Sequence, residues 1–153
     1  MNPLWQTEFA AAQTEVILRS LKHWTGRELL PAVPAAARAE QLFNAPFVLV
    51  SHGTQADPVL NYGNAAALKL WEMSWEQFTR TPSRFTAEAP NREERARLLA
   101  EVTSRGFIDD YSGVRISSGG RRFRIAQATV WNLLGTDGQQ AGQAAMFSQW
   151  EFL

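Results

Sequence analysis

The stretch HGTQADPVLNYGNAAALKLWE, residues 52–72, decides how this chain folds. It predicts the end of one strand, a turn at Asp57-Pro58, a second strand over Val59 to Tyr62, and then a helix. The side-chain oxygen of Asn64 can accept a free amide hydrogen from the first turn of that helix, so we expect Asn64 to be its N-cap. Because the second strand leads directly into an alanine-rich helix, the helix should lie close to the sheet.

Helices are predicted before this stretch. Apolar residues recur at helical spacing over residues 4–24, which indicates an amphipathic helix. Its apolar stripe must be buried, either against the same domain or against a second copy of the chain. Two prolines interrupt the pattern, a short helix over Ala35 to Phe43 follows, and FVLVS at 47–51 predicts a buried strand.

The segment after residue 72 predicts two more helices. Ser74 is expected to cap a short helix over residues 75–79, and residues 81–90 are expected to form a loop. A longer helix should begin at Asn91 and end at Gly106. Its apolar face is predicted to contain Leu98, Leu99 and Val102, and its solvated face to contain charged residues that include Arg92, Arg95 and Arg97.

The last third of the chain predicts three strands joined by tight turns, over Phe107 to Ser117, Arg121 to Leu134 and Gln143 to Phe152. The odd positions of the middle strand suggest one face against a core. These positions are Arg121, Phe123, Ile125, Gln127, Thr129, Trp131 and Leu133. The order of elements indicates an α+β domain in which the central helices cover one face of an antiparallel sheet.

Composition narrows the classes of function. The 153 residues include 15 basic and 15 acidic side chains, so no overall field favours nucleic acid or anionic lipid. Cysteine is absent, which excludes disulfides and thiolate chemistry. No apolar run approaches the roughly 20 residues that span a bilayer, and the N-terminus does not resemble a secretory signal. We therefore expect a cytoplasmic protein without a membrane or nucleic-acid partner.

The chain resembles PAS domains, and among them the MEKHLA domain family. NYGNAAALKLW (61–71) stands where PAS domains have a strand, an asparagine and a helix, and residues 120–150 stand where they have two long strands around an Asp-Gly turn. The residues that resemble the MEKHLA domain are FVLVSHGTQADPVLNYGN, LWEMSWEQF, PSRFTAE and RISSGGRRFRIAQATVWNL. The resemblance implies a five-stranded antiparallel sheet with helices on one face, over residues 39–153, preceded by an N-terminal helical extension over residues 1–38.

The resemblance also implies a core that sometimes opens into a ligand cavity. Nine residues are candidates to line it: Tyr62, Asn64, Trp71, Trp75, Phe85, Gln127, Thr129, Trp131 and Phe147. Trp150 belongs to the same aromatic set, although aromatic residues also form ordinary cores. Gln127 and Thr129 would need polar partners among apolar neighbours, and a ligand, a water or a side chain would serve.

The sequence leaves the cofactor unknown. PAS domains that bind haem take a histidine from the central helices, where this chain has none, and His52 lies in the predicted loop instead. Without cysteine, neither a flavin adduct nor a covalently attached chromophore can form, while noncovalent flavin remains open. Arg115, with the arginines at 121, 122 and 124, can hold an anion or form an exposed strand edge paired with acidic residues.

Three functions are compatible with these residues. The first is a non-catalytic sensory domain that binds a small, largely apolar molecule between sheet and helices and signals to a separate effector protein. The second is a ligand-free interaction module that forms a homodimer through the N-terminal helix and the sheet face. The third is a small enzyme that uses the same cavity, although no catalytic residue or metal site stands out.

Overall fold

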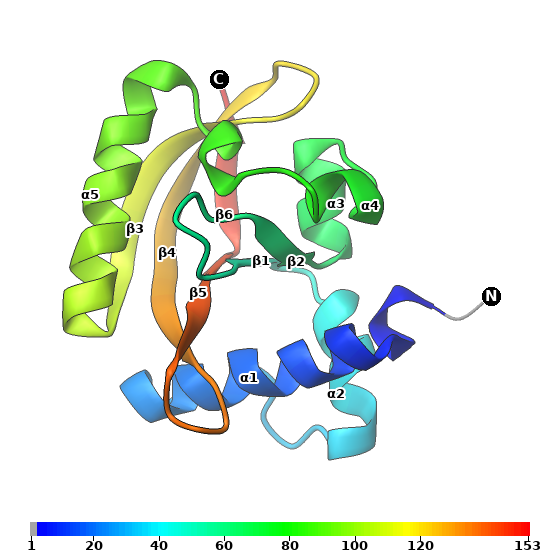
Figure 1. Ribbon diagram of the computed structural model, residues 1–153. Helices are drawn as coiled ribbons and strands as arrows, with labels where there is room; N and C mark the ends of the chain where they lie inside the picture. The colour runs from blue at the N-terminus through cyan, green and yellow to red at the C-terminus, as the bar shows by residue number, and fades with distance from the viewer. Residues whose placement is uncertain (1–2) are drawn as a thin grey trace.

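The computed structural model describes residues 3–153, without the side chains of residues 89 and 90, and shows an α+β fold with one antiparallel sheet. The sheet has helices on both faces (Figure 1). The helical elements are η1 (Leu4–Gln6), α1 (Glu8–Thr25), α2 (Ala35–Phe43), α3 (Ala65–Trp71), α4 (Trp75–Phe78), η2 (Ser83–Thr86) and α5 (Ala89–Arg105). The strands are β1 (Val48–His52), β2 (Leu60–Gly63), β3 (Phe107–Ile116), β4 (Arg122–Leu134), β5 (Gln140–Phe147) and β6 (Gln149–Phe152).

The sheet has the order β2-β1-β5-β4-β3, and every neighbouring pair is antiparallel. The sixth strand, β6, pairs with β4. Because β3 occupies one edge of β4, β6 continues along the edge that β5 uses. The predicted final strand is thus two strands that Ser148 separates, and this interruption is why the sheet has six strands where five are predicted.

The long strand β4 changes the direction of its side chains at Gln127, which has φ 52°. Before this residue, Phe123 and Ile125 pack with the central helices. After it, Trp131 and Leu133 pack with α1 on the opposite face of the sheet. A residue in the left-handed region interrupts the alternation of an extended chain. The prediction that all odd positions of this strand share one face is therefore wrong beyond Ile125.

Helix α1 covers the face of the sheet that the central helices leave free (Figure 1). Ile17 and Leu21 are fully buried against Trp131, whose indole Nε1 donates a hydrogen bond to the Ile17 carbonyl oxygen at 3.2 Å. Trp24 Nε1 donates to the carbonyl oxygen of Asn132 at 2.9 Å. The C-terminal half of the apolar stripe is therefore buried within its own domain, while Phe9 near its start stays exposed.

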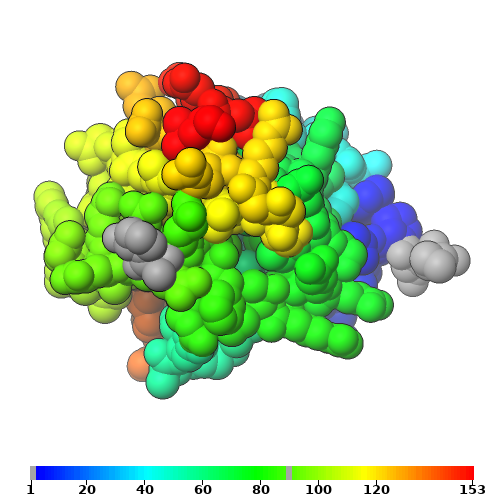
Figure 2. Space-filling model, turned by 90° about the horizontal axis from the view of Figure 1, so that it is seen from above, coloured from blue at the N-terminus to red at the C-terminus, as the bar shows by residue number. Residues whose placement is uncertain are grey.

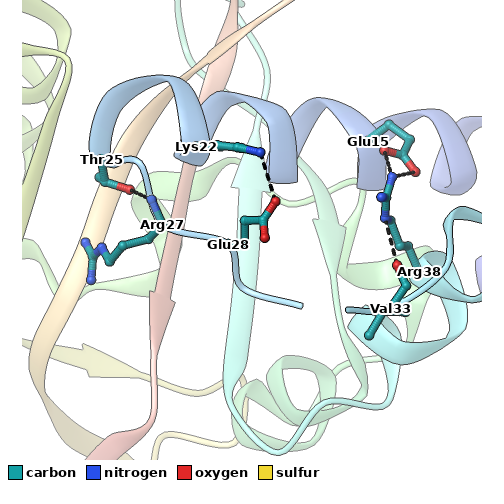
Figure 3. A network of polar contacts seen from close by, with 7 residues as sticks. All are labelled: Glu15, Lys22, Thr25, Arg27, Glu28, Val33 and Arg38. Carbon is teal, nitrogen blue, oxygen red and sulfur yellow. Dashed lines mark hydrogen bonds and ion pairs between the residues drawn. The ribbon is translucent and has the colours of Figure 1, made fainter. Parts of the chain in front are cut away.

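Polar contacts hold the segment between α1 and α2 against the outer side of α1 (Figure 3). Arg38 of α2 pairs with Glu15 of α1 at 3.2 Å, and its Nε donates to the Val33 carbonyl oxygen. Lys22 pairs with Glu28 at 2.9 Å. These side chains are substantially exposed, so they orient the segment more than they stabilise it.

Several predicted boundaries are confirmed and others move. Helix α2 has its predicted range, and Ser74 Oγ accepts the Gln77 amide as the cap of α4. Helix α5 begins two residues before Asn91 and ends at the predicted Gly106, which has φ 98°. The predicted loop 81–90 contains η2 and the start of α5. No helix among residues 3–153 is both long and apolar enough to cross a membrane.

Candidate functional site

A cavity of about 60 Å³ lies between the sheet and the central helices. Its apolar wall comes from the sheet and from α3, and includes Trp71, Ile125, Val130 and Phe147. Ile125 and Val130 both face the cavity because the change at Gln127 lies between them. The cavity is small compared with the roughly 300 Å³ or more of typical ligand pockets. It suits a molecule of a few heavy atoms.

Two arginine side chains form the polar side of this cavity. Arg95 comes from α5, and its Nη2 donates to the hydroxyl of Ser83 in η2 at 2.7 Å. Arg115 comes from β3, is 7% exposed, and donates from Nη2 to the Tyr111 hydroxyl at 3.1 Å. Burial, and next the nearby charge of Arg115, lower the pKa of Arg95 to about 10.

The arginine at 95 belongs to the inward face of α5. Arg95, Leu98, Leu99 and Val102 follow the spacing i, i+3, i+4, i+7, which defines one helical face. The prediction that Arg95 is solvated is wrong, because it grouped Arg95 with its exposed charged neighbours. Its position relative to the leucines is the sequence signal that identifies it.

The arginine at 115 also departs from its predicted environment. Its neighbours Arg121, Arg122 and Arg124 are exposed, as the strand-edge interpretation expects, and Arg122 pairs with Glu88 at 3.8 Å. Arg115 points inward together with Tyr111, two strand periods earlier. Arg115 lies opposite the buried Phe123 in the β3–β4 register, whereas Arg122 and Arg124 flank Phe123 and face outward.

His52 lies at the inward-facing end of β1, where a loop is predicted, and it lines the cavity. Its Nδ1 is 3.0 Å from the Gly53 carbonyl oxygen, a contact in which a protonated Nδ1 donates. Burial lowers the pKa of the His52 imidazole, and the charge of Arg95 adds to this effect. In a neutral imidazole whose Nδ1 carries the proton, Nε2 is an acceptor.

Two buried ring nitrogens at the cavity have no hydrogen-bond partner within the described part of the chain. They are Nε1 of Trp71, a donor, and Nε2 of His52. Trp71 is 2% exposed and His52 is 9% exposed, so bulk water does not compensate them. A buried polar group without a partner costs about 1–3 kcal/mol, and a bound molecule would offset this cost.

Gln143 connects the cavity to the C-terminal part of α5. Its Nε2 donates to the Leu99 carbonyl oxygen at 3.1 Å and to the Thr103 hydroxyl at 3.0 Å. Beside it, Asn132 Nδ2 donates to the Val102 carbonyl oxygen at 2.9 Å. These bonds attach α5 to β4 and β5, so a change at Gln143 reaches the helix directly.

Of the nine predicted cavity residues, Trp71 and Phe147 line the cavity. Gln127 is exposed, and Thr129 and Trp131 point to the α1 face because of the change at Gln127. For that reason these three residues do not line this cavity.

Four further candidates lie away from the cavity: Tyr62, Trp75, Phe85 and Asn64. Tyr62 is buried in the core under α1, where burial raises the pKa of its phenol, and Trp75 stacks edge-on against it at 5.6 Å. Phe85 is 44% exposed between the guanidinium groups of Arg84 and Arg92.

The β1–β2 register shift between Ser51 and His52 explains why Leu60 faces the cavity while Tyr62 faces α1.

Asn64 is the predicted N-cap, and its side chain is fully used within the fold. Its Oδ1 accepts the amides of Ala67 and Leu49, both at 3.1 Å. Its Nδ2 donates to the carbonyl oxygens of Phe47 and Leu42. Asn64 therefore joins the end of α2, β1 and the start of α3, and has no capacity left for a ligand.

Solved structures with a similar fold are PAS and light-oxygen-voltage domains. A PAS domain of a protein from Colwellia psychrerythraea superposes with a TM-score of 0.62 and 16% identity, over 77% of this chain and 95% of that one. The light-state dimer of the fungal blue-light photoreceptor Vivid has a TM-score of 0.59 and 12% identity, over 95% of each chain. At these identities the likeness concerns the fold alone.

Sequence comparison is more specific. The homeobox-leucine zipper protein ATHB-14 of Arabidopsis thaliana is 29% identical over 100 residues, which are 65% of this chain and 12% of that protein. The family model described as the MEKHLA domain matches residues 11–152. The match starts inside α1 and spans the predicted domain boundary at residues 38 and 39, which stays a prediction. With a PAS fold and a match over most of its length, this chain belongs to the MEKHLA domain family.

Proposed function

We propose that this domain is a sensory module that binds a small molecule in the cavity between the sheet and helices α3 and α5, and that signals to a separate protein. The observation that carries the proposal is the cavity with two buried, unpartnered ring nitrogens, Trp71 Nε1 and His52 Nε2. Trp71 and His52 both line an open volume, so a bound molecule could supply the missing hydrogen-bond partners.

Flavin does not fit this cavity, although a flavin analogue has been used to study the mechanism of a light-oxygen-voltage domain with a similar fold. The available volume of about 60 Å³ is several-fold too small for a ring system of that size. The bound molecule is therefore a smaller one, and the chemistry of the site comes from the residues of this chain.

Helix α5 is the element that transmits occupancy in this proposal. Arg95 on its first half and the Gln143 contact on its second half both belong to the cavity. A ligand that contacts these groups favours one position of α5, and its outward, charged face then presents a different surface to a partner protein.

Native mass spectrometry of the gently purified protein tests the proposal, together with hydrogen exchange. We expect a retained small molecule or, after a ligand screen, a ligand that slows amide exchange in α5. Ala145→Leu, which fills the cavity, should abolish the effect, and Gln149→Ala, at an exposed position of β6, should preserve it. Failure to find any ligand, together with unchanged exchange across the screen, would refute a sensory role for the cavity.

The second candidate is a homodimer through the N-terminal helix. Part of the predicted stripe is buried against the sheet, but Phe9, another residue of that stripe, is 49% exposed. In this candidate, Phe9 lies near the centre of the dimer interface. Phe9→Ser should then halve the mass in solution, whereas an unchanged mass would exclude this contact.

A further inference from the structure

Arg115, which is buried, and Arg95, which is half-buried, share one cavity without an acidic partner among the described residues. The ion pairs among the described residues use other basic side chains, and neither Arg95 nor Arg115 forms one. Arg115 is 7% exposed, and the pKa of Arg95 is lowered first by burial and then by Arg115. Two cations that are partly removed from water and raise each other's energy are stabilised when an anion joins them.

The contacts made by these side chains leave donors free. Arg95 donates one bond to Ser83, and Arg115 donates to the Val114 carbonyl oxygen and the Tyr111 hydroxyl. A guanidinium group carries several more N–H donors than these bonds use. Their acceptors are neutral oxygens, so the positive charge remains uncompensated.

The remaining cavity residues and the volume indicate which uncharged part a bound anion can have. The cavity also has an apolar wall that includes Ile125, Val130 and Phe147. Trp71 adds an unpartnered indole N–H, which can donate a hydrogen bond to a ligand oxygen. A volume of about 60 Å³ admits a charged group with a short hydrocarbon part. The fork of guanidinium donors binds carboxylate and phosphate oxygens alike, and the apolar wall favours an anion that carries a hydrocarbon part.

We propose that the cavity binds a short-chain carboxylate. The carboxylate group lies at Arg95 and Arg115, and the hydrocarbon part contacts the wall formed by β4 and β5. This proposal rests on the sensory function proposed above and names its ligand class. Bound in this way, the anion links α5 to β3 through its two arginines, so occupancy and the position of α5 are coupled.

Calorimetric titration with propionate, propionamide and inorganic phosphate tests the ligand class on the unmodified protein. Propionate should bind, and propionamide, which has nearly the same shape without the charge, should bind at least about tenfold more weakly. Equal binding of propionamide would overturn the carboxylate proposal while leaving the sensory function intact. Tighter binding of phosphate would overturn it in favour of a tetrahedral anion, and binding of no compound, anionic or neutral, in a wider screen would remove both proposals.

Substitutions assign the binding to the arginines. Arg95→Gln and Arg115→Gln should each weaken propionate about 10- to 100-fold, because each removes a charge-assisted contact. Arg97→Gln is the matched control, since Arg97 is an exposed arginine on the same helix that pairs with Glu93. If a glutamine variant does not fold, Arg95→Lys replaces it and should keep the charge but weaken binding through the lost second donor. Undiminished binding in folded Arg95 and Arg115 variants contradicts the proposal.

Discussion

The two faces of the sheet are closed in different ways. One continuous helix, α1, covers the outer face, and its stripe fills the space above Trp131 and Leu133. Several short segments, α3, α4, η2 and the separate helix α5, cover the other face (Figure 1). Seen from above, the β3–β4 turn meets the segments of residues 70–100 at this end of the molecule (Figure 2). The cavity and its two arginines lie on this second face.

The comparison shows how a cavity arises without any special sequence motif. A single amphipathic helix offers a regular row of side chains that a strand can complement along its length. Short segments meet at their ends, where backbone and side-chain polar groups gather and apolar side chains do not fill every space. The same strand, β4, serves both faces because Gln127 redirects its side chains.

The largest expected effect separates the two buried tryptophans. Trp131→Phe removes apolar area and the hydrogen bond to Ile17, so we expect it to lower the free energy of unfolding by about 2–4 kcal/mol. Trp71→Phe removes apolar area but also an unpartnered donor. We therefore expect it to lower the free energy of unfolding by at least about 1 kcal/mol less than Trp131→Phe does. Urea denaturation of both variants without ligand measures the difference. Equal losses would show that the two faces satisfy their indoles equally well.

An intermediate effect compares two adjacent alanines of β5. Ala144 packs in the core under α1, opposite Trp131, whereas Ala145 points toward the cavity beside Val130. Ala144→Val should overpack a filled core and destabilise the protein by about 1–3 kcal/mol. Ala145→Val should change stability by less than about 1 kcal/mol because the cavity accepts the added carbons. Thermal denaturation that ranks the two variants in the opposite order would contradict this account of the two faces.

The smallest expected effect concerns the pH dependence of the cavity face. Because the pKa of His52 is lowered in the folded protein, the unfolded chain takes up a proton first as the pH falls below about 6.5. The folded state should therefore lose stability on acidification through this range, and His52→Asn should lose less than the unmodified protein. Urea denaturation at pH 7.5 and pH 5.5 tests this, with the exposed His23→Asn as control. An identical loss in all three proteins would assign the pH dependence to other groups.

Much of the fold could be predicted because its signals are local. The caps at Asn64 and Ser74, the helix over residues 35–43 and the stop at Gly106 each depend on a few neighbouring residues. The cavity could be predicted only in outline. The sequence pattern indicates Trp71 and Phe147, but it places Arg95 on a solvated face and His52 in a loop because their neighbours in the sequence are exposed.

The sequence by itself determined the class of the fold, the order of the elements and the position of the central helix, because capping and hydrophobic period act between residues that are close in the chain. Tertiary structure alone decided toward which helices each half of β4 directs its side chains, and where the stripe of α1 is buried. It also decided that Arg95 and Arg115 line the same cavity. The reason is physical. One residue with positive φ at Gln127 reverses the alternation of every side chain that follows, and only packing from both sides of the sheet holds it there.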